Sequence, residues 1–138
     1  MQSSTHSLRI MIVEDDPDDQ FILKKIFSSL LPQAVIFIID NGHDCIEYLE
    51  THLHELPELI SMDLNMPLMN GLETTAHIKK DLRLNHIPIV ILSTSDRETD
   101  MNAAKQRGAD DYYVKNINYD TLKDTLKSIS DKWVKSDK

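Results

Sequence analysis

The sequence has a single cysteine, few basic residues relative to acidic ones, and no long apolar run. Cys45 has no partner for an intrachain disulfide, which is compatible with a reducing compartment. No window reaches the roughly 20 apolar residues of a membrane span. The polar opening "MQSSTHSLRI" lacks the apolar stretch of a signal peptide. We therefore expect a cytoplasmic protein that does not associate with membranes.

The charge balance argues against one class of partner. Lys and Arg number 15 against 23 Asp and Glu, which gives a formal net charge of -8. Nonspecific nucleic-acid binding requires a positive surface that displaces counterions, so we expect no nucleic-acid partner. An acidic protein is better suited to recruiting a cation or to meeting a basic partner surface.

The length of the chain fits one domain. Its 138 residues, 41% hydrophobic and 28% charged, are typical of a soluble globular protein with a sizeable core. The sequence contains no repeat, low-complexity tract or Gly/Ser linker. We expect a single domain over residues 1–138, with a flexible lead over residues 1–7 and a flexible tail over residues 136–138.

Short apolar runs alternate with segments in which apolar residues recur at helical spacing. Asp16 and Pro17 are expected to begin the first helix as N-cap and first helical residue, and Gly108 to end the fourth. Leu53 is expected to extend the apolar stripe of the second helix, and the third helix is expected over Leu72–Leu82. The five expected strands are Leu8–Val13, Ala34–Ile39, Leu59–Asp63, Ile87–Ser93 and Asp111–Lys115.

This alternation predicts the fold class. Five strands and five helices in turn indicate an α/β, doubly wound (βα)5 fold, with helices on both faces of a parallel five-stranded sheet. The flavodoxin-type strand order 2-1-3-4-5 places the first and third strands side by side. In such a fold the functional crevice lies beyond the carboxyl ends of the strands.

Polar residues follow four of the five expected strands at this carboxyl edge. Several carboxylates gathered there would repel one another and raise their pKa values unless a cation is present, and Mg2+ is the cation that takes oxygen ligands together with a phosphate. A lysine at the same edge can hold a phosphoryl oxygen. The pattern predicts a phosphoryl-transfer site with Asp63 as the nucleophile. The residues at this edge are Glu14, Asp15, Asp16, Asp63, Ser93, Thr94 and Lys115.

Four motifs carry a family resemblance. "MIVEDDP", "SMDLNMPLMNG", "IPIVILST" and "GADDYYVK" resemble, in order and spacing, the four signatures of the CheY-like receiver domain of two-component response regulators. The resemblance runs from about Leu8 to the last helix. The "HLHELPELI" segment and the last helix are similar to single-domain regulators partnered with bacterial phytochromes.

The resemblance implies a phospho-acceptor and a metal site. It implies that Asp63 accepts a phosphoryl group from a sensor histidine kinase and binds Mg2+ together with Asp15. Asn65 fills the position whose backbone carbonyl binds the metal, and Glu14 the position that acts on the metal through water.

It also implies roles around the phosphoryl group. Lys115, Ser93 and Thr94 fill positions that bind phosphoryl oxygens. Ser93 and Tyr112 fill the switch positions, at which the phosphate changes the conformation. The positions that tune the loss of the phosphate are Asn65 and Ser95. Asn116 follows Lys115 where the family usually has proline, which leaves the isomer of that peptide open.

A stand-alone receiver of this kind is a signalling protein that catalyses only its own phosphorylation and dephosphorylation. Its output is expected to pass to a downstream protein target or a histidine phosphotransfer protein. A phosphorylation-linked homodimer through the fourth and fifth helices is a further expectation.

Other interpretations compete with this one. A metal-dependent phosphohydrolase with an aspartate nucleophile generally has a second acid two residues later, where this chain has Asn65. In a flavodoxin-like electron carrier, "EDDPDD" would repel the flavin phosphate. Asp18 and Asp19 are interpreted only as acids that favour the start of a helix. The histidines are expected to be surface residues.

Overall fold

A computed structural model describes residues 8–134 of the chain. The expected flexible lead (1–7) and tail (136–138) lie outside the described residues. Five parallel strands form one sheet in the order β2-β1-β3-β4-β5, which confirms the predicted doubly wound fold. The strands are β1 (Arg9–Val13), β2 (Val35–Ile39), β3 (Leu59–Met62), β4 (Ile89–Ser93) and β5 (Asp111–Val114).

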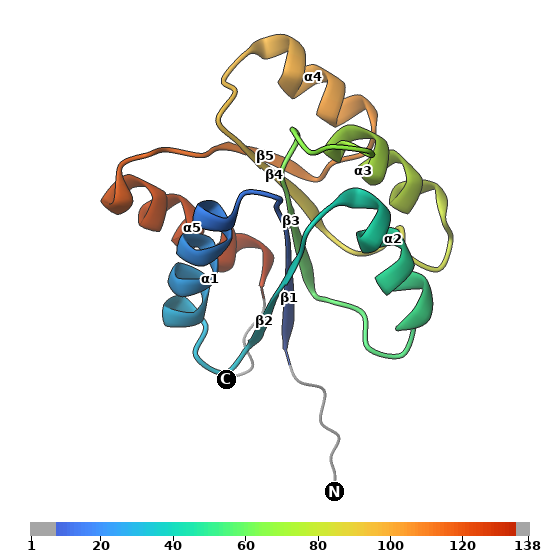
Figure 1. Ribbon diagram of the computed structural model, residues 1–138, viewed down its shortest axis with the longest axis horizontal. Coiled ribbons are helices and arrows are strands. Elements are labelled where there is room, and N and C mark those ends of the chain that lie inside the picture. Colours follow the sequence, from blue (N-terminus) through green and yellow to red (C-terminus); the bar gives the residue numbers. More distant parts are fainter. Residues whose placement is uncertain (1–7, 135–138) are drawn as a thin grey trace, which may run out of the picture.

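One helix follows each strand, and the helices cover both faces of the sheet. α1 and α5 lie together on one face, and α2, α3 and α4 lie on the other (Figure 1). The helices are α1 (Pro17–Leu30), α2 (Gly42–Thr51), α3 (Gly71–Lys80), α4 (Glu98–Gln106) and α5 (Tyr119–Trp133).

The sheet separates two hydrophobic cores. Successive strand residues point to opposite faces, so Ile10 and Ile12 of β1 pack with α1 and α5, and Met11 and Val13 pack on the other side. Every residue of β3 and of β4 is buried, as expected for central parallel strands. No helix within residues 8–134 has the length and apolar character that crossing a membrane requires.

The helix ends show which local signals were read correctly. The Asp16 carboxylate accepts the backbone N–H of Asp19 at 2.9 Å, and Pro17 is the first residue of α1. Gly108 has a φ of 98° just after α4, the left-handed conformation of a helix C-terminus. α3 begins with a capping box between Asn70 and Glu73, which the sequence analysis did not identify.

Two predicted helix ends were wrong. α3 ends at Lys80 and not at Leu82, because the Asp81 carboxylate accepts the backbone N–H of Arg83 at 2.9 Å and this turn competes with the helix. Leu82 is consequently 88% exposed. α2 ends at Thr51, so Leu53 lies outside it and is exposed. Each of the five strands is one or two residues shorter than predicted.

Candidate functional site

The carboxyl ends of β1 and β3 bring three carboxylates together. Val13 pairs with Met62 in the sheet, and the Asp63 backbone N–H donates to the Val13 carbonyl at 3.0 Å. Glu14, Asp15 and Asp63 each offer a carboxylate oxygen within 4.8 Å of the others. Glu14 and Asp63 are buried and Asp15 is exposed. A hard divalent cation fits such an oxygen-rich group at the edge of the solvent.

Lys115 supplies the positive charge of the site. Its Nζ donates to Glu14 Oε1 at 2.8 Å and to Asp19 Oδ2 at 2.9 Å, and lies 4.0 Å from Asp63 Oδ1. The Lys115 backbone N–H donates to the Ser93 carbonyl at 2.6 Å, which fixes the lysine at the end of β5. The side chain is buried, so these ion pairs are screened less than surface pairs.

Asp19 was misread from the sequence. Its carboxylate lies in the first turn of α1 but pairs with Lys115, so it belongs to the site and does more than favour a helix start. The pairing depends on how α1 lies against the end of β5, and no sequence motif signals it. The peptide between Lys115 and Asn116, which the sequence left open, is trans, since residues 8–134 contain no cis peptide.

The surroundings of Asp63 and Glu14 disfavour the ionised carboxylates. Burial, with the charges of Glu14 and Asp15, raises the pKa of Asp63 to about 7, while Lys115 and the Asn65 backbone N–H act to lower it. Burial also raises the pKa of Glu14, partly offset by its hydrogen bond from Lys115. For Lys115, burial acts to lower the pKa, but Glu14 and Asp19 outweigh it and the pKa is raised.

The predicted switch residues meet at the β4–α4 loop. Ser93 is fully buried, and its Oγ accepts the backbone N–H of Ser95 at 3.1 Å. The Tyr112 hydroxyl donates to the Ser95 carbonyl at 2.8 Å. Tyr112 and Tyr113 pack in different cores, on opposite faces of the sheet.

The remaining predicted residues are more exposed. Thr94 is exposed and lines a cavity of about 250 Å³ with Lys115 and Asn116. Asn65 is exposed in the β3–α3 loop and lines a polar cavity of about 350 Å³ with Asp100 at the start of α4.

Gly71 is a supporting residue that sequence reasoning missed. It is the first residue of α3, and a Cβ atom there would lie 2.1 Å from the carbonyl oxygen of Asp63. The close approach of these two backbones therefore requires glycine. The glycine that closes the "SMDLNMPLMNG" motif was the available signal.

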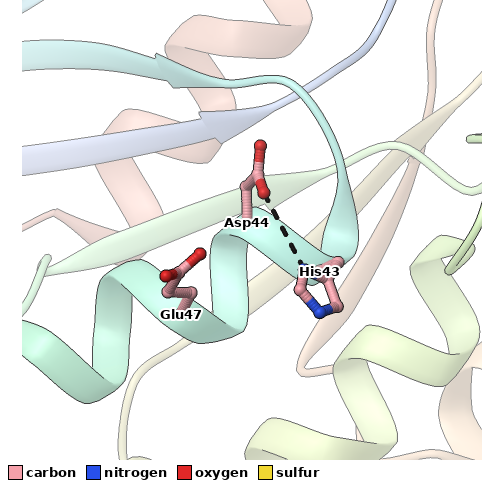
Figure 2. A group of neighbouring side chains, drawn as sticks. All are labelled: His43, Asp44 and Glu47. Carbon is pink, nitrogen blue, oxygen red and sulfur yellow. Dashed lines mark ion pairs between the residues drawn. The ribbon is translucent and has the colours of Figure 1, made fainter.

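A second group of potential metal ligands lies in the first two turns of α2. His43, Asp44 and Glu47 present ligand atoms within 4.8 Å of one another, and His43 and Asp44 form an ion pair at 3.9 Å (Figure 2). All three are exposed, and Asp44 is already engaged with Asn41 in the helix cap. We assign no site to this group.

Comparison with known proteins places this geometry in a family context. The family model described as the response regulator receiver domain matches residues 10–127. Protein PilH of Pseudomonas aeruginosa is 32% identical over 121 residues, which cover 88% of this chain and 96% of PilH. Response regulator Rcp1 of Synechocystis is 28% identical over 131 residues, 92% of this chain and 89% of Rcp1.

Solved structures agree with this match. The phosphorylated cyanobacterial phytochrome response regulator RcpA superposes with a TM-score of 0.85 at 28% identity, over 97% of this chain and 98% of that one. The Mn(2+)-bound form of Rcp1 has a TM-score of 0.83 at 27% identity, over 95% and 97%. The similarity to phytochrome-partnered regulators expected from the sequence is thus confirmed.

Proposed function

The chain belongs to the response regulator receiver domain family, a family of phosphorylation-based signalling proteins, and we propose that Asp63 is its phospho-acceptor. One observation carries the proposal: the Asp63 carboxylate is buried, grouped with Glu14 and Asp15, and 4.0 Å from the Lys115 ammonium. This is a nucleophile placed between a cation site and a fixed positive charge. The matches give no support to the phosphohydrolase alternative.

The residues present fit a divalent cation, which we propose is Mg2+. Asp15, Asp63 and the backbone carbonyl of Asn65 would hold it directly. Both Glu14 oxygens are already engaged, one by Lys115 and the other by the Asp16 backbone N–H at 3.1 Å, which favours a role through water. The cation would neutralise negative charge on the phosphoryl oxygens. The relative Rcp1 was crystallised with Mn(2+).

The transfer step follows from these positions. An Asp63 oxygen attacks the phosphorus of a phosphohistidine on a sensor kinase, the O–P bond forms, the P–N bond breaks, and the electron pair returns to the imidazole. Lys115 and the Thr94 backbone N–H receive the phosphoryl oxygens. Because Ser93 Oγ already accepts a hydrogen bond from Ser95, its own proton is free to be donated to a phosphoryl oxygen.

The switch follows from the added charge. The phosphate brings about -1.5 to -2 charge to the carboxyl edge and draws Ser93 toward it. Ser93 and Tyr112 are both hydrogen-bonded to Ser95. Movement of either residue should therefore shift the other and the loop that leads into α4. Asn65 and Ser95 would then tune how water reaches the phosphorus.

The proposed partners are a sensor histidine kinase and either a downstream protein target or a histidine phosphotransfer protein. We further propose one receiver domain over residues 1–138, a cytoplasmic location, and a phosphorylation-linked homodimer through α4 and α5. The protein would catalyse only its own phosphorylation and dephosphorylation.

Phosphotransfer profiling against candidate kinases, with acetyl phosphate as a small donor, tests the proposal. The wild type should gain one acid-labile, hydroxylamine-sensitive phosphate per chain, and a strong chelator should abolish labelling. Asp63→Ala should gain none. Asp96→Ala, which removes an exposed carboxylate from the β4–α4 loop, is the matched control and should label normally. Labelling of Asp63→Ala at the wild-type level would overturn the proposal.

A further inference from the structure

Ser95 is a junction between the proposed switch residues and α4. Its backbone N–H donates to Ser93 Oγ at 3.1 Å, and its carbonyl accepts the Tyr112 hydroxyl at 2.8 Å. Its own hydroxyl donates to an Asp100 carboxylate oxygen, and Ser95 Oγ accepts the Arg97 backbone N–H at 3.2 Å. Its backbone N–H, its carbonyl and its hydroxyl are therefore all used, and they contact β4, β5 and the start of α4 respectively.

Asp100 is the acceptor that ties this junction to α4. It lies in the first turn of the helix with its side chain 27% exposed, and the same oxygen accepts the Arg97 guanidinium at 3.3 Å. The hydrogen bond from Ser95, with the Arg97 charge, lowers the pKa of Asp100, so the carboxylate is ionised at neutral pH. An ionised acceptor makes the stronger kind of hydrogen bond.

The rest of α4 gives the junction little other support. Its N-cap residue, Arg97, makes no side-chain capping hydrogen bond, and Ala104 is its single fully buried residue. Hydrophobic packing therefore holds this helix more weakly than α1 or α5, each of which buries several large side chains. The position of the β4–α4 loop accordingly depends on the polar contact between Ser95 and Asp100.

We propose that Asp100 is a positioning residue for the phosphoryl-transfer site. By holding the Ser95 hydroxyl, it keeps the Ser95 backbone where its N–H orients the Ser93 hydroxyl and its carbonyl retains Tyr112. Asp100 does not touch the phosphoryl group and acts through Ser95. This inference rests on the proposed function of Asp63.

A double-mutant cycle tests the coupling. The rate constant for phosphorylation by acetyl phosphate is measured for the wild type, Asp100→Ala, Ser95→Ala and the double variant. Asp100→Ala should slow phosphorylation about three- to tenfold, the effect expected when the net contribution of one typical hydrogen bond is lost. In the Ser95→Ala background the same substitution should change the rate less than about twofold, because the hydroxyl it held is gone.

Two further variants separate positioning from folding. Asp100→Asn keeps an oxygen acceptor for the Ser95 hydroxyl and should recover most of the rate. Glu98→Ala, an exposed acid in the same helical turn, should leave the rate unchanged. Equal effects of Asp100→Ala in both backgrounds would overturn the inference while leaving Asp63 as acceptor. Absence of phosphate on Asp63 in the wild type would overturn both this inference and the proposed function.

Discussion

At the residue scale, the chemistry concentrates on one carboxylate whose surroundings oppose its charge. Asp63 is buried beside Glu14 and Asp15, and Lys115 only partly compensates for their repulsion. The ionised form of a carboxylate in such surroundings is unfavourable without a counter-ion. The carboxylate therefore responds to a bound cation or to a change in its own charge.

The raised pKa of Asp63 predicts a pH-dependent stability in the metal-free protein. Its pKa is about 7 in the folded chain, against an ordinary value near 3.8 for an aspartate. The folded state therefore holds the proton more tightly, so the stabilising contribution is fully present below pH 4 and is lost as the pH rises through 7. Asp63→Asn has no such proton. In the presence of chelator at pH 8 it should be more stable than the wild type by about 1–3 kcal/mol in urea unfolding.

The comparison at low pH supplies the control. At pH 4 the wild-type side chain is protonated in the folded state, so the two proteins should differ little in free energy of unfolding. Stability curves for the wild type and Asp63→Asn that run parallel from pH 4 to pH 8 would contradict the prediction.

Leu68 has an unfavourable backbone conformation. It is the one non-glycine residue with a positive φ, 70°, within residues 8–134, and its side chain is 89% exposed. The left-handed conformation is unfavourable for leucine and tolerated by asparagine. Leu68→Asn should raise the free energy of unfolding by about 0.5–1 kcal/mol. Leu82→Asn, at a leucine equally exposed but without the positive φ, should change it by less; equal gains would rule out backbone strain as the cause.

Sequence reasoning found most of the acidic site but missed residues placed by tertiary contacts. Glu14, Asp63 and Lys115 directly follow a strand and Asp15 comes one residue later, so the strand order alone brings them to one edge. Asp19 reaches the site from a helix, at an angle that depends on how α1 packs, and no strand end marks it.

At the scale of elements, the start of α3 supports the proposed phospho-acceptor, Asp63, through its backbone. Gly71 lies against the carbonyl of Asp63, and the Gly71 N–H donates to the Leu64 carbonyl at 3.0 Å. The capping box of Asn70 and Glu73 fixes the same turn. The segment from the end of β3 to the first turn of α3 is thus one tightly constrained unit.

Gly71→Ala tests that constraint. A Cβ placed 2.1 Å from the Asp63 carbonyl oxygen forces backbone to move, so the free energy of unfolding should fall by about 2 kcal/mol or more, and phosphorylation by acetyl phosphate should slow markedly. Gly108→Ala is the matched control. Its free energy of unfolding should also fall by about 1 kcal/mol, because Gly108 has a φ of 98°. Its phosphorylation rate should equal that of the wild type, because Gly108 lies next to Lys79 and away from the site. Normal stability of Gly71→Ala would contradict this account.

Element boundaries were predicted less well than element types, for a local reason. The third helix stops at Lys80 because Asp81 offers its carboxylate to the next turn, a competition that apolar periodicity does not register. The start of α1 was more predictable, since Asp16 with Pro17 provides an N-cap signal in the sequence itself.

At the scale of the whole molecule, the strand order could be predicted because the alternation of strands and helices leaves few topologies. The observed order places β1 and β3 side by side, as in the flavodoxin-type order expected from the sequence. The division into two cores results from the alternation of strand side chains between the two faces of the sheet. The polar network through Ser95 and Asp100 could not be predicted, because it depends on side-chain directions in a loop.

A cation bound at the carboxyl edge should stabilise the whole fold, because it would bind residues from two non-consecutive strand ends only when the sheet is formed. Mg2+ at a tenfold excess over its Kd should raise the free energy of unfolding by about 1.4 kcal/mol. The gain should be larger at pH 8 than at pH 5.5, since a proton on Asp63, whose pKa is about 7, competes with the cation. Thermal unfolding at both pH values, with Mg2+ or chelator, measures this gain in stability.

Two variants show where the cation binds. Mg2+ should no longer stabilise Asp15→Asn, and it should still stabilise Asp44→Asn, in the exposed group of α2. The reverse pattern would show that the cation binds at α2 and not at the carboxyl edge.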